Sequence, residues 1–433
     1  MMQFLHAFPH LRPPECLRTA RARSKHRTLS PAMLTFHSAS ARIVDSRRAI
    51  ADCLEAACGD RASDIDLLVI HASIGHDFHA LAEEAAILAP RARVVGASCC
   101  GVVGTEGVSE SLKDIAIMAV RGPELAVAHV DGIHGHNSAD RARSLAADLK
   151  RRLPGVNMVF FMASGIDIDN DACIAAIEDE LGPEVTIFGA TSADNMRGVH
   201  SYQIHGTGVF SHSAWLVGFA DPSLAVDTQA SHGFIAIGDP LVVTRADGNR
   251  IHELDGRPAW GEYTRRLGLA ADATCAETIP IGALAEELPA DLAGEYGNGH
   301  ILRVVTRRDD DGTLHYPATV AEGTRLWLTL RDEQRIFDDL DRMMRAISRR
   351  IGGAEIAAVF HADCLARGRH FLHRILKEEL VSRMQQPLAR DGVVPPWLGM
   401  YGFGEFARLG GRNTFHNYTS AIYTLYRRQP GTA

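Results

Sequence analysis

A strand–helix–strand unit that recurs along the chain constrains the fold more than any other sequence feature. Residues 64–73 (DIDLLVIHAS) form an apolar, β-branched run next to acidic residues, which predicts a buried strand. Two further apolar runs, 93–98 and 114–120, lie on either side of a glycine-rich segment and predict two more strands. Between the first two runs, residues spaced for one helix face predict an amphipathic helix: Phe78, Leu81, Ala82 and Ala85.

The same order of elements returns in the middle of the chain. Residues 156–164, 185–191 and 213–220 predict strands, and residues 169–181 predict the helix that follows the first of them. The two copies align at small and polar residues. Ser73 aligns with Ser164, and Gly96-Ala97-Ser98 aligns with Gly189-Ala190-Thr191.

A looser third copy lies near the C-terminus. Residues 355–364 and 418–427 predict strands, residues 397–406 predict a strand and a turn, and residues 370–384 predict a helix. Repeated strand–helix–strand units predict an α/β fold with a layered mixed-sheet architecture. Because ligands of open α/β sheets bind beyond the carboxyl ends of the strands, we expect polar residues at those ends to line a binding edge.

Residues 240–330 differ in pattern from the three copies. Residues 240–256 predict a β-hairpin that turns at Asp247-Gly248-Asn249, and residues 300–330 predict further antiparallel strands. We expect residues 270–300, rich in Ala, Glu and Gly, to form an exposed excursion. Asp332 is then expected to cap a long amphipathic helix. These segments add an antiparallel β and hairpin portion to the repeat-built fold.

Residues 1–32 have a composition unlike that of the following chain. They hold six basic residues and one acidic residue, without the apolar core of a secretory signal. We expect them to be a disordered basic tail, or to precede a true start at Met33. We predict two domains in the remainder, residues 33–235 and residues 236–428.

Charge and cysteine usage limit the class of protein. The net charge of −8 argues against a nucleic-acid-binding surface, which is usually basic. No apolar run reaches the roughly 18 to 20 residues that a membrane span needs. The eight cysteines include no C-x-x-C pair, which is typical of reduced thiols in a reducing compartment. We therefore predict a cytoplasmic protein that binds neither nucleic acid nor a membrane.

The glycine-rich segment VVGASCCGVVGTEG, residues 94–107, has part of a phosphate-binding pattern. Gly96 and Gly101 have the G-x-x-x-x-G spacing of a P-loop. Val102 and Val103 stand where a P-loop has its phosphate-binding lysine and magnesium-binding hydroxyl. The segment therefore does not predict nucleotide hydrolysis.

Thiol chemistry is a hypothesis that the cysteines leave open. Cys99 and Cys100 are adjacent and have no resolving partner in a C-x-x-C spacing. Cys364 precedes Arg367 and Arg369, which would favour its thiolate. One alternative function is therefore a thiol-dependent enzyme that uses Cys364 or Cys99. The other interpretation is that these cysteines are small buried hydrophobic residues.

The 21 histidines raise the question of a metal or haem. The H-x-x-H pairs His76/His79 and His370/His373 have the spacing of one helix face, but each lacks a third ligand. We assign no metal site from them. Haem needs only one protein ligand. Candidate haem ligands are the histidines in or beside the predicted strands: His71, His361 and His416.

Binding of a small molecule needs the fewest additional assumptions. Turns rich in Gly, Ser and Thr expose backbone N–H groups that hold carboxylates and similar anions. Arg245 and Arg367 could add positive charge. Hydroxyl side chains occur at or near equivalent places in the repeat: Ser73, Ser98, Thr105, Ser164 and Thr191.

This succession of segments resembles the FIST family over about residues 40–428. The first predicted domain is similar to a FIST N domain in DLLVIHAS, VVGASCCGVVGTEG, TIFGATSADN and AWLVGFA. The second is similar to a FIST C domain in VVTRADGNRIHELDGRPAWGEYTRRLG, DCLARGR, GMYGFGEF and TFHNYTSAIYTLY. The order of these segments is specific to the family, whereas no single segment is.

The resemblance implies a sensory protein without catalytic activity that binds a small ligand, such as an amino acid or a related metabolite. FIST proteins are often fused to, or encoded near, histidine kinases, diguanylate cyclases or chemotaxis receptors. We therefore expect a separate signalling partner, for example in a two-component system. Some stand-alone members are haem proteins that sense nitric oxide and regulate a histidine kinase, which is the alternative function within the family.

The family motifs also imply which residues bind the ligand. Cys99 and Cys100 stand where FIST proteins more often have Ser-Thr, a departure that points to a different ligand specificity. Taken with the hydroxyls of the repeat, the predicted ligand-binding residues are Ser73, Gly96, Ser98, Cys99, Cys100, Gly101, Ser164, Gly189, Thr191, Arg367, Gly404, Glu405 and Asn417.

Overall fold

The repeat predicted from the sequence occurs three times in the structure, and each copy is longer than predicted. The structure is a computed structural model that describes residues 33–428 except 196, 306, 317–318 and 368–371. The predicted segment 1–32 lies outside the described residues. The first repeat consists of β1 (Thr35–Arg42), α1 (Ser46–Cys58), the 3₁₀ turn η1 (Gly59–Asp64), β2 (Leu67–Ser73), α2 (Phe78–Leu88), β3 (Arg93–Cys99), β4 (Val102–Gly104), β5 (Gly107–Ser109) and β6 (Asp114–Arg121).

The strands and α-helices of the second repeat follow in the same order, and its 3₁₀ turn precedes the first helix instead of following it. An initial strand and helix, which the sequence patterns did not predict, precede the predicted strands in both copies. The elements are β7 (Leu125–Val130), η2 (Gly135–Asn137), α3 (Ser138–Arg152), β8 (Met158–Ala163), α4 (Asn170–Leu181), β9 (Thr186–Thr191), β10 (Gln203–His205), β11 (Gly208–Phe210) and β12 (Ala214–Phe219).

The third repeat is interrupted after its first strand by an inserted segment. The strand and turn predicted over residues 397–406 correspond to β23 and to Phe403-Gly404 after it, and the last two residues begin β24, which belongs to a different sheet. The predicted helix 370–384 begins instead at Arg374. The elements are β13 (Leu224–Ser231), α8 (Glu333–Ile351), β22 (Ile356–Cys364), η3 (Leu365–Arg367), α9 (Arg374–Gln385), η4 (Gln386–Leu388), β23 (Trp397–Gly402), β24 (Glu405–Leu409), β25 (Arg412–His416) and β26 (Ser420–Arg427).

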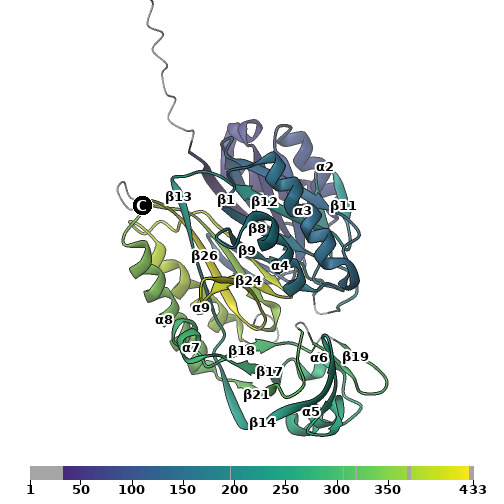
Figure 1. The fold of residues 1–433 in the computed structure, drawn as a ribbon. Coiled ribbons are helices and arrows are strands. Elements are labelled where there is room, and N and C mark those ends of the chain that lie inside the picture. Colours follow the sequence, from purple (N-terminus) through teal and green to yellow (C-terminus); the bar gives the residue numbers. More distant parts are fainter. Residues whose placement is uncertain (1–32, 196, 306, 317–318, 368–371, 429–433) are drawn as a thin grey trace, which may run out of the picture. The chain divides into compact units, whose positions relative to one another are not determined.

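The inserted segment forms antiparallel sheet structure, as predicted (Figure 1). The expectation of an exposed excursion over residues 270–300 is wrong, since Ala283, Leu284 and Ala285 of β17 are buried in a sheet between β18 and β21. The elements are β14 (Phe234–Asp247), β15 (Arg250–Leu254), β16 (Arg257–Pro258), α5 (Ala259–Leu267), α6 (Cys275–Thr278), β17 (Gly282–Glu287), α7 (Ala290–Tyr296), β18 (His300–Arg303), β19 (Arg307–Arg308), β20 (Leu314–His315) and β21 (Arg325–Arg331).

Aspartates begin four of the helices, including the predicted Asp332. Each accepts a hydrogen bond from the backbone N–H three residues later, over 2.8 Å at Asp45, 3.1 Å at Asp77, 3.0 Å at Asp169 and 2.7 Å at Asp332. These bonds satisfy one of the N–H groups that the first helical turn leaves without a partner. The same local signal therefore marks at least one helix start in each of the three repeats.

The three repeats exchange their short hairpins. Within the described residues, each repeat sheet has the order first strand, last strand, second strand, third strand and then a hairpin from another repeat. The β4–β5 hairpin joins the sheet of the third repeat, β10–β11 joins that of the first, and β24–β25 joins that of the second. The predicted α/β architecture of repeated strand–helix–strand units with an added antiparallel portion is confirmed.

The hairpin exchange joins the two predicted domains, 33–235 and 236–428, through shared sheets. Strands from both sides of residue 235 share sheets, because β4 pairs with β23 and β9 pairs with β24. The described residues of 33–428 belong to one compact unit. The position of the domain boundary remains a prediction.

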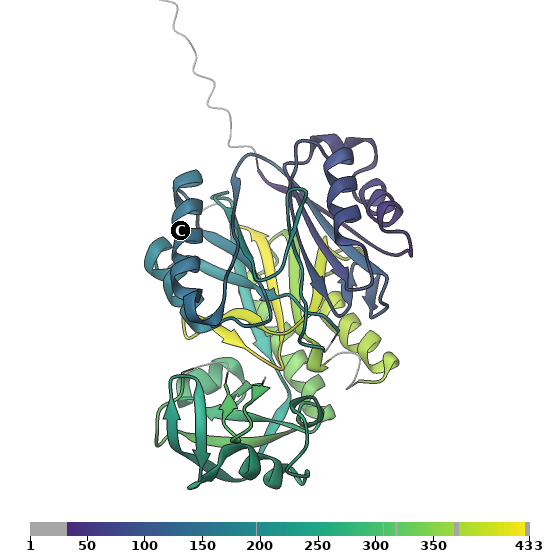
Figure 2. The ribbon, with the colours of Figure 1, turned by 90° about the vertical axis from the view of Figure 1, so that its right-hand side faces the viewer.

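The apolar core has a layer on each face of the repeat sheets. The α1–α2 and α3–α4 pairs lie on opposite sides of the strands between them (Figure 2). One face of each sheet packs on its own helix pair, and the other face contributes to a shared central cluster. At the centre, the Phe160 ring lies 4.8 Å from that of Phe360 and 5.4 Å from that of Phe188, measured between centroids. Aromatic packing therefore joins the second and third repeats.

Candidate ligand-binding site

Three pairs of backbone hydrogen bonds join the repeats where the hairpins cross between sheets. The Ser98 N–H donates to Tyr202 at 2.8 Å, and the Ser98 carbonyl accepts from Ala193 at 2.9 Å. The other two joints have the same pattern. Thr191 is bonded in this way to Phe403 and Gly404, and Tyr401 is bonded to Cys100 and Gly101.

The predicted Gly-Ala-Ser/Thr motif lies at these joints. The Ser98 hydroxyl donates to the carbonyl of Ala193 at 2.8 Å and accepts from the Tyr202 N–H at 2.8 Å. These bonds leave the hydroxyl engaged inside the protein. The structure therefore gives Ser98 a role in joining the first two repeats, and ligand contact by Ser98 and Thr191 remains a prediction.

The predicted glycines allow close approach of backbones at the joints. A Cβ on Gly189 would lie 2.0 Å from the carbonyl oxygen of Phe161, and the φ of 138° disfavours any other residue. A Cβ on Gly96 would lie 2.8 Å from the Ile70 carbonyl oxygen. Similar overlap, with a backbone oxygen at Gly101 and an aromatic ring at Gly404, accounts for the other two predicted glycines.

The cysteine pair is part of the protein interior. Cys99 is buried in the central cluster, where burial raises the pKa of its thiol far above the usual value. The Cys100 sulfur accepts a hydrogen bond from the backbone N–H of Asn195 at 3.0 Å. Ser73 lies buried at the end of β2 opposite Cys99, and the hydroxyl of Ser164 donates to the carbonyl of Ile166 at 3.1 Å.

Arg367 is the centre of a second group of predicted residues. Its side chain is fully buried at the end of β22, 1% exposed. Nε donates to the Asp363 carboxylate at 3.2 Å, and Nη1 donates to the carbonyl of His232 at 2.6 Å. Nη2 is buried without a hydrogen-bond partner among the described residues. A buried guanidinium nitrogen without a partner loses its hydration without compensation, so a hydrogen-bond acceptor beside Nη2 would be stabilising.

Glu405 provides a matching acceptor that also lacks a partner. The side chain is 0% exposed, and one carboxyl oxygen accepts from the Thr419 hydroxyl at 2.7 Å. The other oxygen, Oε1, is buried and makes no hydrogen bond to any described residue. Burial raises the pKa of the Glu405 carboxyl well above its usual value, and the positive charge of Arg367 offsets only part of this increase. The two groups therefore lie within electrostatic reach of each other.

The second repeat has Gln203 at the position that Glu405 holds in the third, and there every polar side-chain atom has a hydrogen-bond partner. Gln203 and Glu405 occupy equivalent places, since they pair with Ala97 and Ala190 in their respective sheets. The Gln203 amide nitrogen donates to the Ser192 hydroxyl at 2.6 Å, and its oxygen accepts from Ser213 at 3.2 Å. Both atoms of Gln203 are engaged, so the fold does not require an unpaired polar atom here.

The inserted segment contributes further residues around this cluster. The Asn417 oxygen accepts from the Val304 N–H at 3.3 Å, and its amide nitrogen donates to the Phe403 carbonyl at 3.2 Å. The Tyr296 hydroxyl lies 3.3 Å from Nδ1 of His416. Burial lowers the pKa of His232 to about 3, so this imidazole is neutral at physiological pH. Predicted Arg367, Gly404, Glu405 and Asn417 thus lie in one region with Thr191.

Four residues of this region were not predicted from the sequence: Asp363, Thr419, His232 and Tyr296. The i, i+4 spacing of Asp363 and Arg367 at the end of an apolar strand is a signal that could have identified the first. His232 and Tyr296 come from a separate part of the chain, and only folding of the insert brings them to Arg367. The predicted Arg245 instead pairs with Glu253 at 3.0 Å, and Thr105 bonds Glu106 at 2.8 Å.

The histidines predicted as haem ligands do not fit a haem in this structure. His71 and His361 are buried among aromatic and aliphatic side chains that leave no room for a water molecule. His416 is bonded on both ring nitrogens, by Thr414 at 2.7 Å and by Tyr296 at 3.3 Å. None of the three presents a nitrogen to a space of haem size.

The H-x-x-H pairs and Cys364 also differ from what the sequence predicted or left open. His76 lies before α2 and is bonded to the Ser46 hydroxyl over 3.1 Å, so the expectation that His76 and His79 share a helix face is wrong. His370 and Arg369 lie outside the described residues. Burial raises the pKa of Cys364 well above its usual value, which favours the interpretation of this cysteine as a small buried hydrophobic residue.

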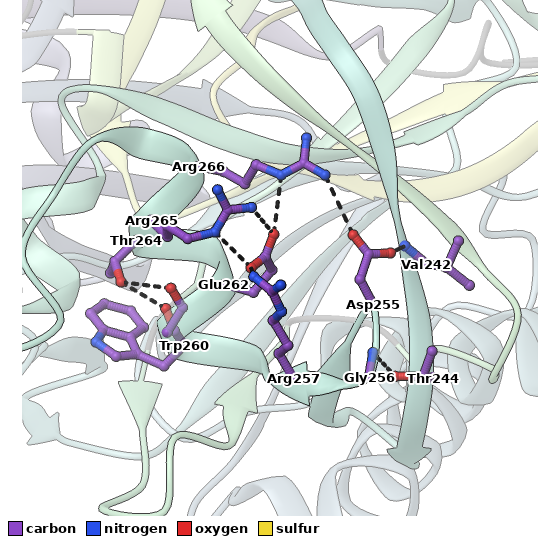
Figure 3. Close-up of polar contacts among 11 residues, drawn as sticks. Val242, Thr244, Asp255, Gly256, Arg257, Trp260, Glu262, Thr264, Arg265 and Arg266 are labelled. Carbon is purple, nitrogen blue, oxygen red and sulfur yellow. Dashed lines mark hydrogen bonds and ion pairs between the residues drawn. The ribbon is translucent and has the colours of Figure 1, made fainter.

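A further charged cluster surrounds Glu262 on α5 (Figure 3). The carboxylate of Glu262 is buried and accepts from Arg265 at 2.9 Å, Arg266 at 3.1 Å and Arg257 at 3.3 Å. Asp255, at the edge of this cluster, accepts from the Val242 N–H at 2.9 Å and fixes the hairpin. Every carboxylate oxygen of Glu262 is engaged, so the cluster is structural in character.

In the described part of the chain, no helix is long and apolar enough to cross a membrane. Sequence relatives are uncharacterized proteins. One from Mycobacterium tuberculosis is 24% identical over 393 residues, which covers 87% of this chain and 96% of the relative. One from Mycobacterium bovis is 27% identical over 212 residues, 48% of this chain and 52% of the relative, so this match spans about half of each protein. One from Methanocaldococcus jannaschii is 26% identical over 227 residues.

Among solved structures, cyanuric acid hydrolase from A. caulinodans aligns with 92% of this chain at 8% identity and a TM-score of 0.33. This TM-score is too low to support an inference about fold or function. Family profiles are more informative: a FIST N domain matches residues 66–257, and a FIST C domain matches residues 259–408. The two matches follow one another along most of the described chain. The chain therefore belongs to the FIST family, with a FIST N domain followed by a FIST C domain.

Proposed function

We propose that this FIST protein is a sensor that binds a small molecule carrying both a carboxylate and a hydrogen-bond donor, such as an amino acid, at Arg367 and Glu405. The observation that carries the proposal is the pair of buried atoms without partners, Nη2 of Arg367 and Oε1 of Glu405. A ligand carboxylate would accept from the guanidinium, which is well suited to planar anions. A ligand ammonium would donate to Glu405.

The charge state of Glu405 supports a ligand that brings its own positive charge. Burial disfavours the ionised carboxyl in the free protein, which is why its pKa is raised. An ammonium group beside Oε1 would favour the ionised form. A zwitterionic ligand would thus satisfy both unpaired groups, and Glu405 would release its proton when the ligand binds.

The proposed role is sensory rather than catalytic. The buried thiols Cys99 and Cys364 have raised pKa values, which disfavour a nucleophilic thiolate. Arg367 also bonds the His232 carbonyl, next to the inserted segment. Ligand binding that changes this contact would alter the surface offered to a separate signalling partner, such as a histidine kinase or a diguanylate cyclase.

The test is a thermal-shift screen of amino acids and related metabolites, followed by calorimetry on the hits. A ligand that binds only the folded protein raises its stability by about 2.7 kcal/mol at 100 times its Kd. We expect Arg367→Lys and Glu405→Gln to weaken binding at least tenfold. Arg427→Lys is the matched control, since Arg427 is a mostly buried arginine paired with Asp221 at 3.0 Å on β26.

Two outcomes contradict the proposal. One is a screen in which no compound with a carboxylate and a donor raises the melting temperature. The other is a hit whose affinity is unchanged in folded Arg367→Lys and Glu405→Gln proteins. For the partner, the assay is autophosphorylation of a histidine kinase encoded beside the gene, measured with the chain and with or without the ligand.

A further inference from the structure

Three loops of the second repeat bring the side chains of His134, Asp167 and His212 together. His134 follows β7, Asp167 follows β8, and His212 lies between β11 and β12. The three side chains each offer one ligand atom, and these atoms all lie within 4.8 Å of one another. Nδ1 of His134 lies 2.9 Å from Oδ2 of Asp167, and the two imidazole rings stack with centroids 4.5 Å apart.

We propose that His134, Asp167 and His212 bind a divalent transition-metal ion of the Zn²⁺ class. Two imidazoles and one carboxylate are a recurring ligand set for such ions, and they leave positions open for water or another ligand. Atoms that share one zinc at bond lengths near 2.0–2.2 Å lie about 3 to 4 Å apart. Small side-chain rotations would bring the three atoms to these separations.

The surrounding backbone holds the three loops in place without the ion. The Ile133 N–H donates to the carbonyl of His212 at 2.7 Å, which ties the first loop to the third. The Ser138 hydroxyl donates to the His134 carbonyl at 2.8 Å and accepts from the Asp169 N–H at 3.0 Å, which ties the first loop to the second. The ligand set is therefore positioned by bonds that involve none of the ligating atoms.

Two further features favour a bound ion over a simple ion pair. Nδ1 of His212 is buried and makes no hydrogen bond to any residue in the described ranges. Asp167 and His212 both adopt left-handed backbone conformations, with φ of 51° and 53°, which are uncommon for residues other than glycine. A metal ion would bond to Nδ1 of His212, and this bond would offset the cost of the left-handed conformations of Asp167 and His212.

The first repeat shows that the fold does not need this ligand set. Its equivalent loops are tied by the same bonds, from Ile43 to the carbonyl of Lys113 at 3.2 Å and from the Asp77 N–H to the Ser46 hydroxyl at 3.0 Å. Lys113 therefore occupies the place of His212, and residues 74–76 contain no carboxylate. Two copies of one scaffold thus differ in the three side chains that would bind the ion.

The site has access for exchange. The side chains of His134 and Asp167 are 34% and 58% exposed. A cavity of about 10 Å³, lined by His212, Ser164, Ser201 and Ile166 among others, lies beside it and has room for about one water molecule. Such a water could complete the coordination of the ion. The inference is independent of the ligand site proposed at Arg367 and Glu405.

The test is Zn²⁺ titration of the full chain by calorimetry, after removal of any affinity tag and treatment with a chelator. We expect the wild-type protein to bind one tight equivalent of Zn²⁺. His134→Ala, His212→Ala and Asp167→Asn should each weaken this binding at least tenfold. His79→Ala is the matched control, because His79 is an exposed histidine on α2 that should leave the tight site unchanged.

A second readout is the visible spectrum with Co²⁺ in place of Zn²⁺, where a tetrahedral site gives intense d–d bands that the variants should lose. Asp167→Asn keeps the shape of the side chain, so loss of binding in a variant that melts like the wild type supports the proposal. Tight Zn²⁺ binding that persists in the folded His134→Ala/His212→Ala double variant would overturn it. So would a wild-type protein that binds Zn²⁺ no more tightly than this double variant.

Discussion

Nη1 of Arg367 donates a 2.6 Å hydrogen bond to the carbonyl of His232, which joins the end of β22 to the start of the inserted segment. The same guanidinium pairs with Asp363 at 3.2 Å. A single fully buried side chain thus connects the third repeat, the insert and the proposed ligand site. Its removal should affect stability as well as binding.

We expect Arg367→Ala to lower the free energy of unfolding by about 3 to 5 kcal/mol, because it leaves the buried Asp363 carboxylate without its partner. Urea denaturation measures this change. The Asp363→Ala/Arg367→Ala double variant should cost less than the sum of the single variants, since neither charge is then left alone. Additive effects would contradict the pairing.

Gly189→Ala should destabilise the protein by more than about 2 kcal/mol. The added methyl group would overlap the carbonyl oxygen of Phe161, and the φ of 138° cannot accommodate a side chain without strain. Gly261→Ala is the opposite case, because Gly261 lies within α5 and a Cβ added there would have no other atom within 4 Å. We expect it to stabilise the protein by about 0.5 to 1 kcal/mol. Thermal unfolding should show a lower melting temperature for Gly189→Ala and a higher one for Gly261→Ala than for the wild type.

Glu262→Gln should lower the melting temperature at pH 7 by a few degrees. Hydrogen bonding from Arg265, and then from Arg266, depresses the pKa of Glu262 from 4.5 to about 2 in the folded protein. Its stabilising contribution is therefore complete above the unfolded pKa near 4.5 and is lost as the pH falls towards 2. The difference in melting temperature between wild type and variant should be constant from pH 6 to 8.

Below pH 4.5 the same difference should shrink, because the unfolded chain then binds a proton at Glu262 that the folded protein takes up only as the pH nears 2. A difference that grows on acidification would contradict this assignment. Asp255→Asn is a useful comparison, because Asp255 contacts Arg266 at 3.4 Å at the edge of the same cluster. We expect a smaller loss of stability from Asp255→Asn, since its side chain is partly exposed.

Protein purified from haem-replete cells should show no Soret band. His71 and His361 have no space beside them, and burial lowers the pKa of His71 to about 3, so it is a neutral residue of the core. An absorbance spectrum with an equimolar haem standard is the measurement. A Soret band that disappears in His71→Ala or His361→Ala would show that these residues open to admit haem.

Thiol reagents should modify Cys58 and Cys275 before Cys99 and Cys364. The first two are partly exposed, whereas the other two are buried and have strongly raised pKa values. Timed labelling of the native protein followed by peptide mass spectrometry gives the order. Rapid modification of Cys364 in the folded protein would contradict this order and would support the hypothesis of a thiol-dependent enzyme.

Local sequence patterns were sufficient to predict the repeated strand–helix–strand unit. Apolar runs of period two and helix faces of period three to four predicted β2, α2, β3 and β6 and their counterparts, because these signals are local. The initial strands β1 and β7 were missed, as were the short hairpins. Hairpin strands of three residues, such as β4 and β10, are too short to produce a clear pattern.

Where those units meet could not be predicted from local patterns and depends on contacts between distant segments. Gly-Ala-Ser/Thr after a strand suggested a pocket edge, but the structure uses Ser98 and Thr191 to join neighbouring repeats, through partners about 95 to 213 positions away in the chain. Arg367, Glu405 and Asn417 were predicted from family motifs, whereas His232 and Tyr296 reach them only through the folded insert. Local hydrophobic patterns predict the order of the elements. Contacts between distant segments depend on which sheet each hairpin joins, and the periodicity of a single segment carries no information about its pairing partner.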